Sequence, residues 1–181
     1  MKNALCAAIV GITGLLITPT IASAQRLQRI PWDVIIPQGS IRFVVLQGFN
    51  FEAVLDQETS LVWEKEPSPD VRLWRDAQVH CTTLVKGGRG GWRLPTIQEL
   101  TSLTLIPPGT GDPLPAGHPF VLSGPLDYWS ATSSETLNPA GSAWVFSVSD
   151  GAIFPKNKIP PVADRSESAW CVRFRQGVDP Q

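Results

Sequence analysis

The chain has 181 residues, of which 43% are apolar and 17% are charged, and its net charge is -1. Soluble domains contain about 25% charged residues, so the surface is poor in charge, while the apolar fraction is too high for a disordered chain. A net charge near zero argues against a general nucleic-acid-binding protein, which is usually strongly basic. The 15 glycines and 17 prolines predict many turns and exclude a coiled coil.

Residues 1–24 are typical of a secretory signal peptide. Lys2 supplies the positive start, residues 4–17 are apolar and uncharged, and residues 22–24 (ASA) have the small-x-small pattern of a cleavage site. We expect cleavage after Ala24 and a secreted or periplasmic protein of a Gram-negative-type envelope, with no membrane span after the signal is removed. An uncleaved anchor is the alternative, but the apolar run is shorter than the ~20 residues of a spanning helix.

Three further regions follow the expected signal peptide. We expect an N-terminal arm with a first strand at 25–47, a domain at 48–177 and a tail at 178–181. The arm is rich in turn residues, and the domain holds most of the apolar periodicity. A single domain is therefore predicted.

The exported part of the chain keeps two cysteines, Cys81 and Cys171. In an oxidising compartment an even pair indicates a disulfide, with two buried free thiols as the alternative. Closing a loop of about 90 residues would contribute up to about 4–5 kcal/mol in the chain-entropy model. A metal site is disfavoured, because neither cysteine has a CxxC partner and His80 is the direct neighbour of Cys81.

The first half of the domain predicts strands and then two helices. Residues 41–46 are apolar and β-branched, which favours a strand, and residues 51–63 predict two short strands around a turn, with apolar residues at alternate positions. Residues 73–85 have apolar side chains at steps of four, four and three, which is one face of a helix. The glycines of 87–91 end that helix.

A second helix is predicted from Thr96, because Thr96 and Glu99 have the T-x-x-E spacing of a capping box. Pro95 and Arg93 come directly before it. We expect Arg93 and Glu99 to fix the junction between loop and helix rather than to take part in chemistry. The prolines from residue 107 end the helix.

The second half of the domain predicts a long loop and then strands. Residues 107–127 are rich in proline and glycine and predict a long irregular loop. Strands are predicted at 128–132, at 143–149 with a hairpin turn leading to 152–154, and at 168–175. This order predicts an α+β fold with two helices packed on a twisted, mostly antiparallel sheet.

Residues 92–100 (WRLPTIQEL) resemble a motif of the Lcl C-terminal domain family, a bacterial family long catalogued as a domain of unknown function. Five more segments resemble that family's motifs in the same order, and the resemblance covers about residues 50–176. These segments are 56–63 (DQETSLVW), 74–81 (WRDAQVHC), 128–132 (YWSAT), 143–151 (AWVFSVSDG) and 169–173 (AWCVR).

The resemblance implies a C-type-lectin-like fold, in which a cysteine of the first helix bridges to the last strand. Cys81 and Cys171 occupy those places. Known members of the family include the carbohydrate-binding end of a collagen-like bacterial adhesin that recognises sulfated polysaccharides. This chain departs from that adhesin, because it has no Gly-X-Y repeat and Ser60 replaces the glycine of the family's TGL motif.

Two sets of side chains are candidates for binding. Six tryptophans lie within predicted elements, where packing in the core is favoured over sugar stacking: Trp63, Trp74, Trp92, Trp129, Trp144 and Trp170. Basic side chains near the C-terminus, opposed by Asp164 and Glu167, could hold sulfate or carboxylate groups, although an ordinary solvated surface is the alternative. They are Lys156, Lys158, Arg165, Arg173 and Arg175, of which Arg173 and Arg175 share a predicted strand face.

Catalytic motifs are sparse, so we expect no enzyme, no metal and no cofactor. His118 lies in the long loop without a serine motif, and His80 adjoins a cysteine that is expected to be bonded. The calcium-binding motifs of C-type lectins are absent, and the loop offers Asp112 and Asp127 where calcium needs six to eight oxygens.

Three functions therefore stay open. The first is a calcium-independent binding or adhesion module for a sulfated or acidic polysaccharide or for a protein of the cell envelope. The second is an enzyme related to formylglycine-generating oxygenases, which need a reactive cysteine pair. The third is a purely structural envelope protein.

Overall fold

The computed structural model describes residues 36–104, 113–135, 141–159 and 167–175. The expected signal peptide, the tail and Arg165 lie outside these residues. Within them the chain forms an α+β fold, as predicted, with two antiparallel sheets and a few helices. None of the helices in these ranges has the length and apolarity that crossing a membrane requires.

The first sheet joins the beginning and the end of the domain. Its strand order is β1-β2-β3-β7, with antiparallel pairing throughout. The strands are β1 (Phe43–Val45), β2 (Ala53–Asp56), β3 (Leu61–Glu64) and β7 (Val172–Phe174). Trp63 of β3 lies opposite Val172 of β7, so residues far apart in the sequence are direct neighbours in this sheet.

The second sheet is a meander of β4 (Asp127–Ser134), β5 (Ser142–Ser147) and β6 (Ile153–Asn157). The predicted hairpin turn at Asp150 and Gly151 joins β5 to β6, and Gly151 has the positive φ of 74° that such a turn favours. The register of β4 against β5 shifts between Trp129 and Ser133.

The sequence predicted a single sheet, and this prediction is wrong, because the described strands form two separate sheets. The two sheets touch through an isolated bridge between Tyr128 and Ser168, which is parallel. The Trp129 N–H donates to the Ser168 carbonyl at 3.0 Å, and the Ser168 N–H donates to the Asp127 carbonyl at 2.8 Å. The strand predicted at 168–175 therefore divides into a stretch against β4 and the short β7 against β3, because each end follows a different partner.

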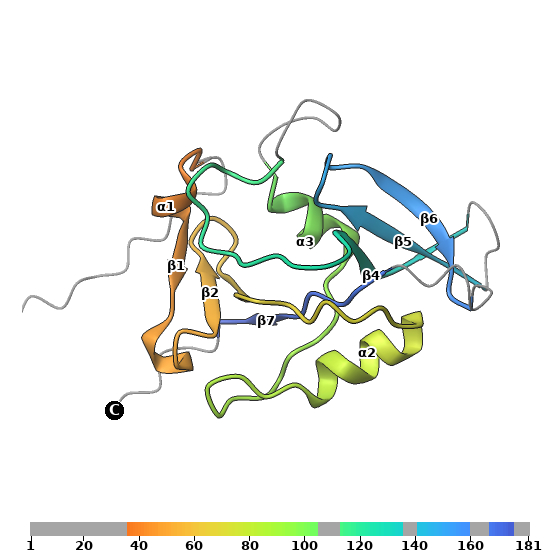
Figure 1. The fold of residues 1–181 in the computed structure, drawn as a ribbon, viewed down its shortest axis with the longest axis horizontal. Helices are drawn as coiled ribbons and strands as arrows, with labels where there is room; N and C mark the ends of the chain where they lie inside the picture. Colours follow the sequence, from red (N-terminus) through yellow and green to blue (C-terminus); the bar gives the residue numbers. More distant parts are fainter. Residues whose placement is uncertain (1–35, 105–112, 136–140, 160–166, 176–181) are drawn as a thin grey trace, which may run out of the picture.

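Both predicted helices are present. They are α2 (Trp74–Thr83) and α3 (Ile97–Ser102), which lie on opposite sides of β7 in Figure 1. The capping box begins α3: the Glu99 N–H donates to the Thr96 hydroxyl at 3.2 Å, and the Thr96 N–H donates to the Glu99 carboxylate at 2.8 Å. These two contacts satisfy N–H groups that a helix start leaves without partners.

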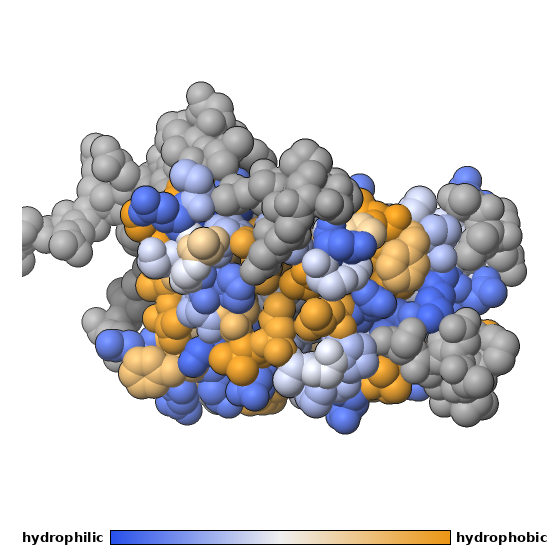
Figure 2. Space-filling model, turned by 45° about the horizontal axis from the view of Figure 1, so that its top comes forward, coloured by the Kyte–Doolittle hydropathy of each residue, from blue (hydrophilic) through white to orange (hydrophobic). Residues whose placement is uncertain are grey.

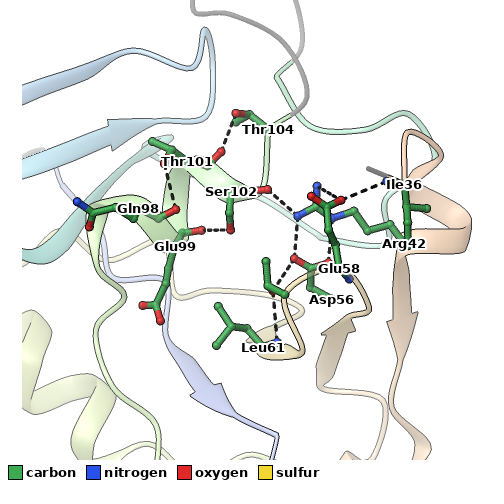
Figure 3. Close-up of polar contacts among 11 residues, drawn as sticks. Ile36, Arg42, Asp56, Glu58, Leu61, Gln98, Glu99, Thr101, Ser102 and Thr104 are labelled. Carbon is green, nitrogen blue, oxygen red and sulfur yellow. Dashed lines mark hydrogen bonds and ion pairs between the residues drawn. The ribbon is translucent and has the colours of Figure 1, made fainter. Parts of the chain in front are cut away.

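A short helical turn, α1 (Gly39–Arg42), replaces the start of the strand predicted at 41–46, and a 3₁₀ turn, η1 (Gln47–Phe49), follows β1. The sequence pattern favours a strand here, but the Arg42 side chain is fully buried and pairs with Asp56. This tertiary contact explains why local β propensity does not decide the start of the segment (Figure 3).

The core lies on both faces of the first sheet. Val54 and Trp63 face one apolar cluster, which includes side chains of α3, while Leu55 and Val62 face another, which includes side chains of α2. The alternating pattern in 51–63 predicted one buried face, but every residue of β2 and β3 is buried, because helices and loops cover both sides.

Tryptophan side chains fill much of this core. Trp63, Trp92, Trp129 and Trp170 are buried, with at most 2% of each exposed. The Trp63 and Trp170 rings pack edge to face with centroids 5.5 Å apart, which is a favourable geometry for aromatic pairs. Trp144 and Trp74 are partly buried. Apolar side chains also gather near the middle of the face in Figure 2, where polar groups surround them.

Candidate functional site

A disulfide between Cys81 and Cys171 ties α2 to the residue that precedes β7. The sulfurs are 2.09 Å apart and the Cα atoms 5.4 Å apart. Both cysteines are fully buried. The alternative of two free thiols is therefore wrong, and the bond fixes the helix that forms one wall of the groove described below.

Arg93 and Glu99 form a bidentate ion pair, with nitrogen–oxygen distances of 2.7 Å and 2.6 Å. Burial opposes ionisation of Glu99, but Arg93 and the Thr96 N–H outweigh it and hold the pKa of Glu99 below its ordinary value. The Arg93 guanidinium also lies 4.6 Å from the centroid of the Phe174 ring. The Pro95 carbonyl accepts the Ala131 N–H. These motif residues join α3 to β4 and β7.

A groove of about 730 Å³ lies between the first half of α2 and the adjoining ends of β5 and β6. Its walls mix aromatic, charged and amide side chains. The lining residues are Leu73, Trp74, Arg75, Asp76, Gln78, Gly141, Asn157, Lys158 and Ile159. A concave site with an apolar floor and a few polar groups is the usual form of a small-molecule site.

Trp74 and Lys158 both line this groove and contact each other. The Trp74 indole N–H donates to the Ser130 carbonyl at 2.8 Å, so β4 fixes the ring while part of its surface stays open. The Lys158 ammonium lies 4.3 Å from the ring centroid and donates to the Ser133 hydroxyl at 2.9 Å. The groove therefore presents a cation held over an aromatic ring.

The start of α2 adds to the electrostatics of the groove. Leu73 occupies the N-cap position and provides no side-chain acceptor for the first N–H groups of the helix. The N-terminal end of a helix carries a partial positive charge. Arg75 is exposed beside it, and within the described residues neither Arg75 nor Lys158 forms an ion pair. Asp76 is the acidic residue of the lining and opposes this positive field.

The structure separates the basic residues that the sequence grouped together. Lys158 lies in the groove, whereas Lys156 of β6 forms an ion pair with the buried Glu167. Arg173 is 4% exposed, donates to the Gly90 carbonyl and lies over aromatic rings on the side of the first sheet. Arg175 is exposed after β7.

Sequence reasoning missed most of the groove. Trp74 was assigned to the core, and Arg75, Asp76, Gln78 and Asn157 were not singled out. A signal was available for α2, because its polar side chains fall on the face opposite the apolar stripe. No comparable signal exists for β6, whose last residues reach the groove only through the pairing of β5 with β6.

The comparison with known families fits this architecture. The model of the Lcl C-terminal domain matches residues 52–173, which run from β2 into β7 and include both cysteines of the disulfide. The chain belongs to the Lcl C-terminal domain family. No curated protein matches the sequence significantly.

Proposed function

We propose that this protein is a binding module that holds an acidic polysaccharide in the groove between α2 and β6, without calcium. The observation that carries the proposal is the Lys158 ammonium placed 4.3 Å over the Trp74 ring in an open groove. Aromatic rings offer an apolar face to the C–H groups of a sugar, and ammonium groups bind sulfate and carboxylate. The acidic group of such a sugar would pair with the Lys158 ammonium, and its C–H groups would contact the part of the Trp74 ring that the ammonium leaves uncovered.

The charges around the groove favour an acidic ligand over a neutral one. Arg75 and the uncapped first turn of α2 supply further positive potential, and amide side chains of Gln78 and Asn157 offer hydrogen bonds to hydroxyl groups. Asp76 weakens this field. Removing the charge of Asp76 should therefore strengthen the binding of an anion. The proposal thus predicts variants that strengthen binding as well as variants that weaken it.

We further propose that the domain has a C-type-lectin-like fold and works in an oxidising compartment after export. The bond from α2 to the chain before β7 supports the fold, since it links the positions that the family resemblance implies. It also supports the compartment, because structural disulfides persist in secreted and periplasmic proteins. Secretion of a tagged full chain, with loss of residues 1–24 detected by mass spectrometry, tests the compartment.

Binding to heparin and to uncharged dextran tests the ligand class. We expect retention on immobilised heparin at low salt, no retention on dextran and no effect of EDTA. Lys158→Ala should weaken heparin binding by about tenfold or more, the loss of one charge-assisted contact, and Arg75→Ala should weaken it less. Asp76→Asn should strengthen it.

Arg175→Ala is the matched control, because it removes one exposed cation outside the groove. If Arg175→Ala weakens binding as much as Lys158→Ala does, net charge rather than the groove holds the polysaccharide. If the wild-type protein is not retained at all, the binding proposal is wrong, and a purely structural envelope protein becomes the better explanation.

A further inference from the structure

A second cluster of polar side chains lies beside the disulfide, whose two cysteines also belong to the apolar cluster that includes α2. Glu64 at the end of β3, His80 of α2 and Cys171 each offer one ligand atom, and these atoms lie within 4.8 Å of one another. The Cys81 sulfur is bonded to that of Cys171 at 2.09 Å, so it adjoins this cluster. Three potential zinc ligands therefore lie close together, and the Cys81 sulfur is bonded to one of them.

Burial is energetically unfavourable for the Glu64 carboxylate and for the His80 Nε2 atom in this cluster. Glu64 is 1% exposed, and its carboxylate accepts the Cys171 N–H at 2.8 Å while its other oxygen lies 3.8 Å from the Lys86 ammonium. The His80 Nε2 atom is buried and has no hydrogen-bond partner among the described residues. A buried carboxylate and an unpartnered buried nitrogen both cost free energy, and a bound cation would offset both costs.

The disulfide itself prevents metal binding in the oxidised protein. Zinc binds thiolate sulfur at about 2.3 Å, histidine nitrogen at about 2.0–2.1 Å and carboxylate oxygen, usually with four ligands in a tetrahedron. A bonded sulfur carries no thiolate charge. In tetrahedral zinc sites the ligand atoms are roughly 3.5 Å apart, so Glu64, His80 and Cys171, whose ligand atoms lie within 4.8 Å of one another, need shifts of about 1 Å. The two sulfurs have to move apart once their bond is broken.

We propose that reduction of the disulfide converts this cluster into a zinc site made of Cys81, Cys171, His80 and Glu64. The reductant is a dithiol: it transfers two electrons and two protons to the disulfide, which becomes two thiols, and is itself oxidised to a disulfide. Zinc then binds both sulfurs as thiolates, and the two thiol protons pass to solvent. The metal replaces the covalent link, so α2 stays tied to the end of the chain in the reduced protein.

The sequence alone does not predict this site, because its ligands come from three separate segments of the chain. His80 and Cys81 are adjacent in α2, Glu64 ends β3 and Cys171 precedes β7. Two cations lie close to Glu64 and oppose a metal, namely Lys86 and Arg72. Replacing Lys86 with a neutral residue should therefore increase the affinity for zinc, which distinguishes a built site from binding by two thiols alone.

The test uses the full chain with Cys6→Ser, so that Cys81 and Cys171 are its only cysteines. The protein is reduced by a phosphine without oxygen, its two thiols are counted, and Co²⁺ is titrated and then displaced by Zn²⁺. We expect one Co²⁺ per reduced chain with a thiolate-to-cobalt charge-transfer band, no band in the oxidised protein, and a rise in Tm of the reduced protein with Zn²⁺.

His80→Gln and Glu64→Gln should each lower the affinity of the reduced protein at least about tenfold, the loss that even supporting residues of a metal site produce. His118→Gln is the control and should change nothing. Lys86→Gln should raise the affinity.

Two results would overturn the proposal. The first is a reduced protein that remains folded and gives no charge-transfer band. The second is equal affinity in His80→Gln, Glu64→Gln and the parent chain, which is the behaviour of two thiolates in an unfolded chain. Where reduction alone unfolds the protein, Zn²⁺ added before the reductant must preserve the near-ultraviolet circular dichroism of the folded state, and failure to do so also rejects the site.

Discussion

Arg42 and Asp56 form an ion pair that is completely buried, with no side-chain area of either residue exposed. Arg42 Nε and Nη2 donate to the two oxygens of Asp56 at 2.9 Å and 2.8 Å, and Nη2 also reaches the Ser102 carbonyl at the end of α3 (Figure 3). Glu58 lies 3.2 Å from the remaining Nη1 nitrogen. One guanidinium therefore connects α1, the turn after β2 and the end of α3.

Breaking this pair should destabilise the protein strongly. Asp56→Ala leaves Arg42 buried without its bidentate partner, and we expect a loss of about 3–5 kcal/mol in the free energy of unfolding, measured with urea. The double variant Arg42→Met/Asp56→Leu should recover much of that loss, because no fully buried charge is left unpaired and Glu58, which also loses its partner, is partly exposed. A loss below about 1 kcal/mol for Asp56→Ala would contradict the role of the pair.

Removing the disulfide should also lower stability. Cys81→Ser or Cys171→Ser opens a link across a sequence separation of 90 residues, and we expect each to lower the free energy of unfolding by about 2–5 kcal/mol. Thermal unfolding with and without a reductant measures this. The Tm of the metal-free wild-type protein should fall to the Tm of the variants when the protein is reduced. The reductant should leave the Tm of the variants unchanged.

The capping box of α3 allows a smaller and more local test. Thr96→Ala removes the hydroxyl that accepts the Glu99 N–H, and we expect a loss of about 1 kcal/mol. Thr101→Ala is a suitable control within the same helix, because the Thr101 hydroxyl donates only to the Gln98 carbonyl one turn earlier. Equal losses in the two variants would show that the cap contributes nothing of its own.

Glu64 should make stability depend on pH. Burial raises the pKa of Glu64 from 4.5 to about 7, against the Cys171 N–H and the cations Lys86 and Arg72, which lower it. The folded chain thus holds this proton more tightly than the unfolded chain. The free energy of unfolding should fall as the pH rises from about 4.5 to about 7, by up to about 3 kcal/mol at about 1.36 kcal/mol per pKa unit.

Glu64→Gln should remove this dependence. The stability of the variant relative to the wild-type protein should increase between pH 4.5 and pH 7.5 in urea unfolding, whereas Glu66→Gln, at an exposed neighbouring position, should follow the wild-type curve. Burial also lowers the pKa of His80 nearby, and that contribution is common to all three proteins. Parallel curves for Glu64→Gln and wild type would contradict a buried, protonated Glu64.

Local patterns in the sequence were sufficient for several elements. The T-x-x-E spacing predicted the start of α3, the apolar steps predicted α2, and Asp150 with Gly151 predicted the β5–β6 turn. In each case residues close in sequence make the contacts that decide the structure. The two sheets were not predicted, because their separation depends on Ser168 pairing with β4 a few residues before β7 pairs with β3.

The candidate site was harder to predict for the same reason. The basic residues near the C-terminus are close in sequence, but Lys158 directly follows β6 and Arg173 lies in β7 of the other sheet, so Lys158 reaches the groove and Arg173 does not. Trp74 was assigned to the core because it lies within a predicted helix, although it is only partly buried. Arg42 gave no signal, because an arginine is expected to be exposed unless a partner distant in sequence pairs with it.

The position of β7 beside β3 has a consequence for biosynthesis. Neither the first sheet nor the Cys81–Cys171 link can be completed before the last residues of the domain have been made. Folding therefore has to wait for the whole domain to leave the ribosome, and its rate is expected to be limited by long-range strand pairing. A premature stop before residue 171 would remove the closing strand and one cysteine together, leaving a chain that cannot complete either.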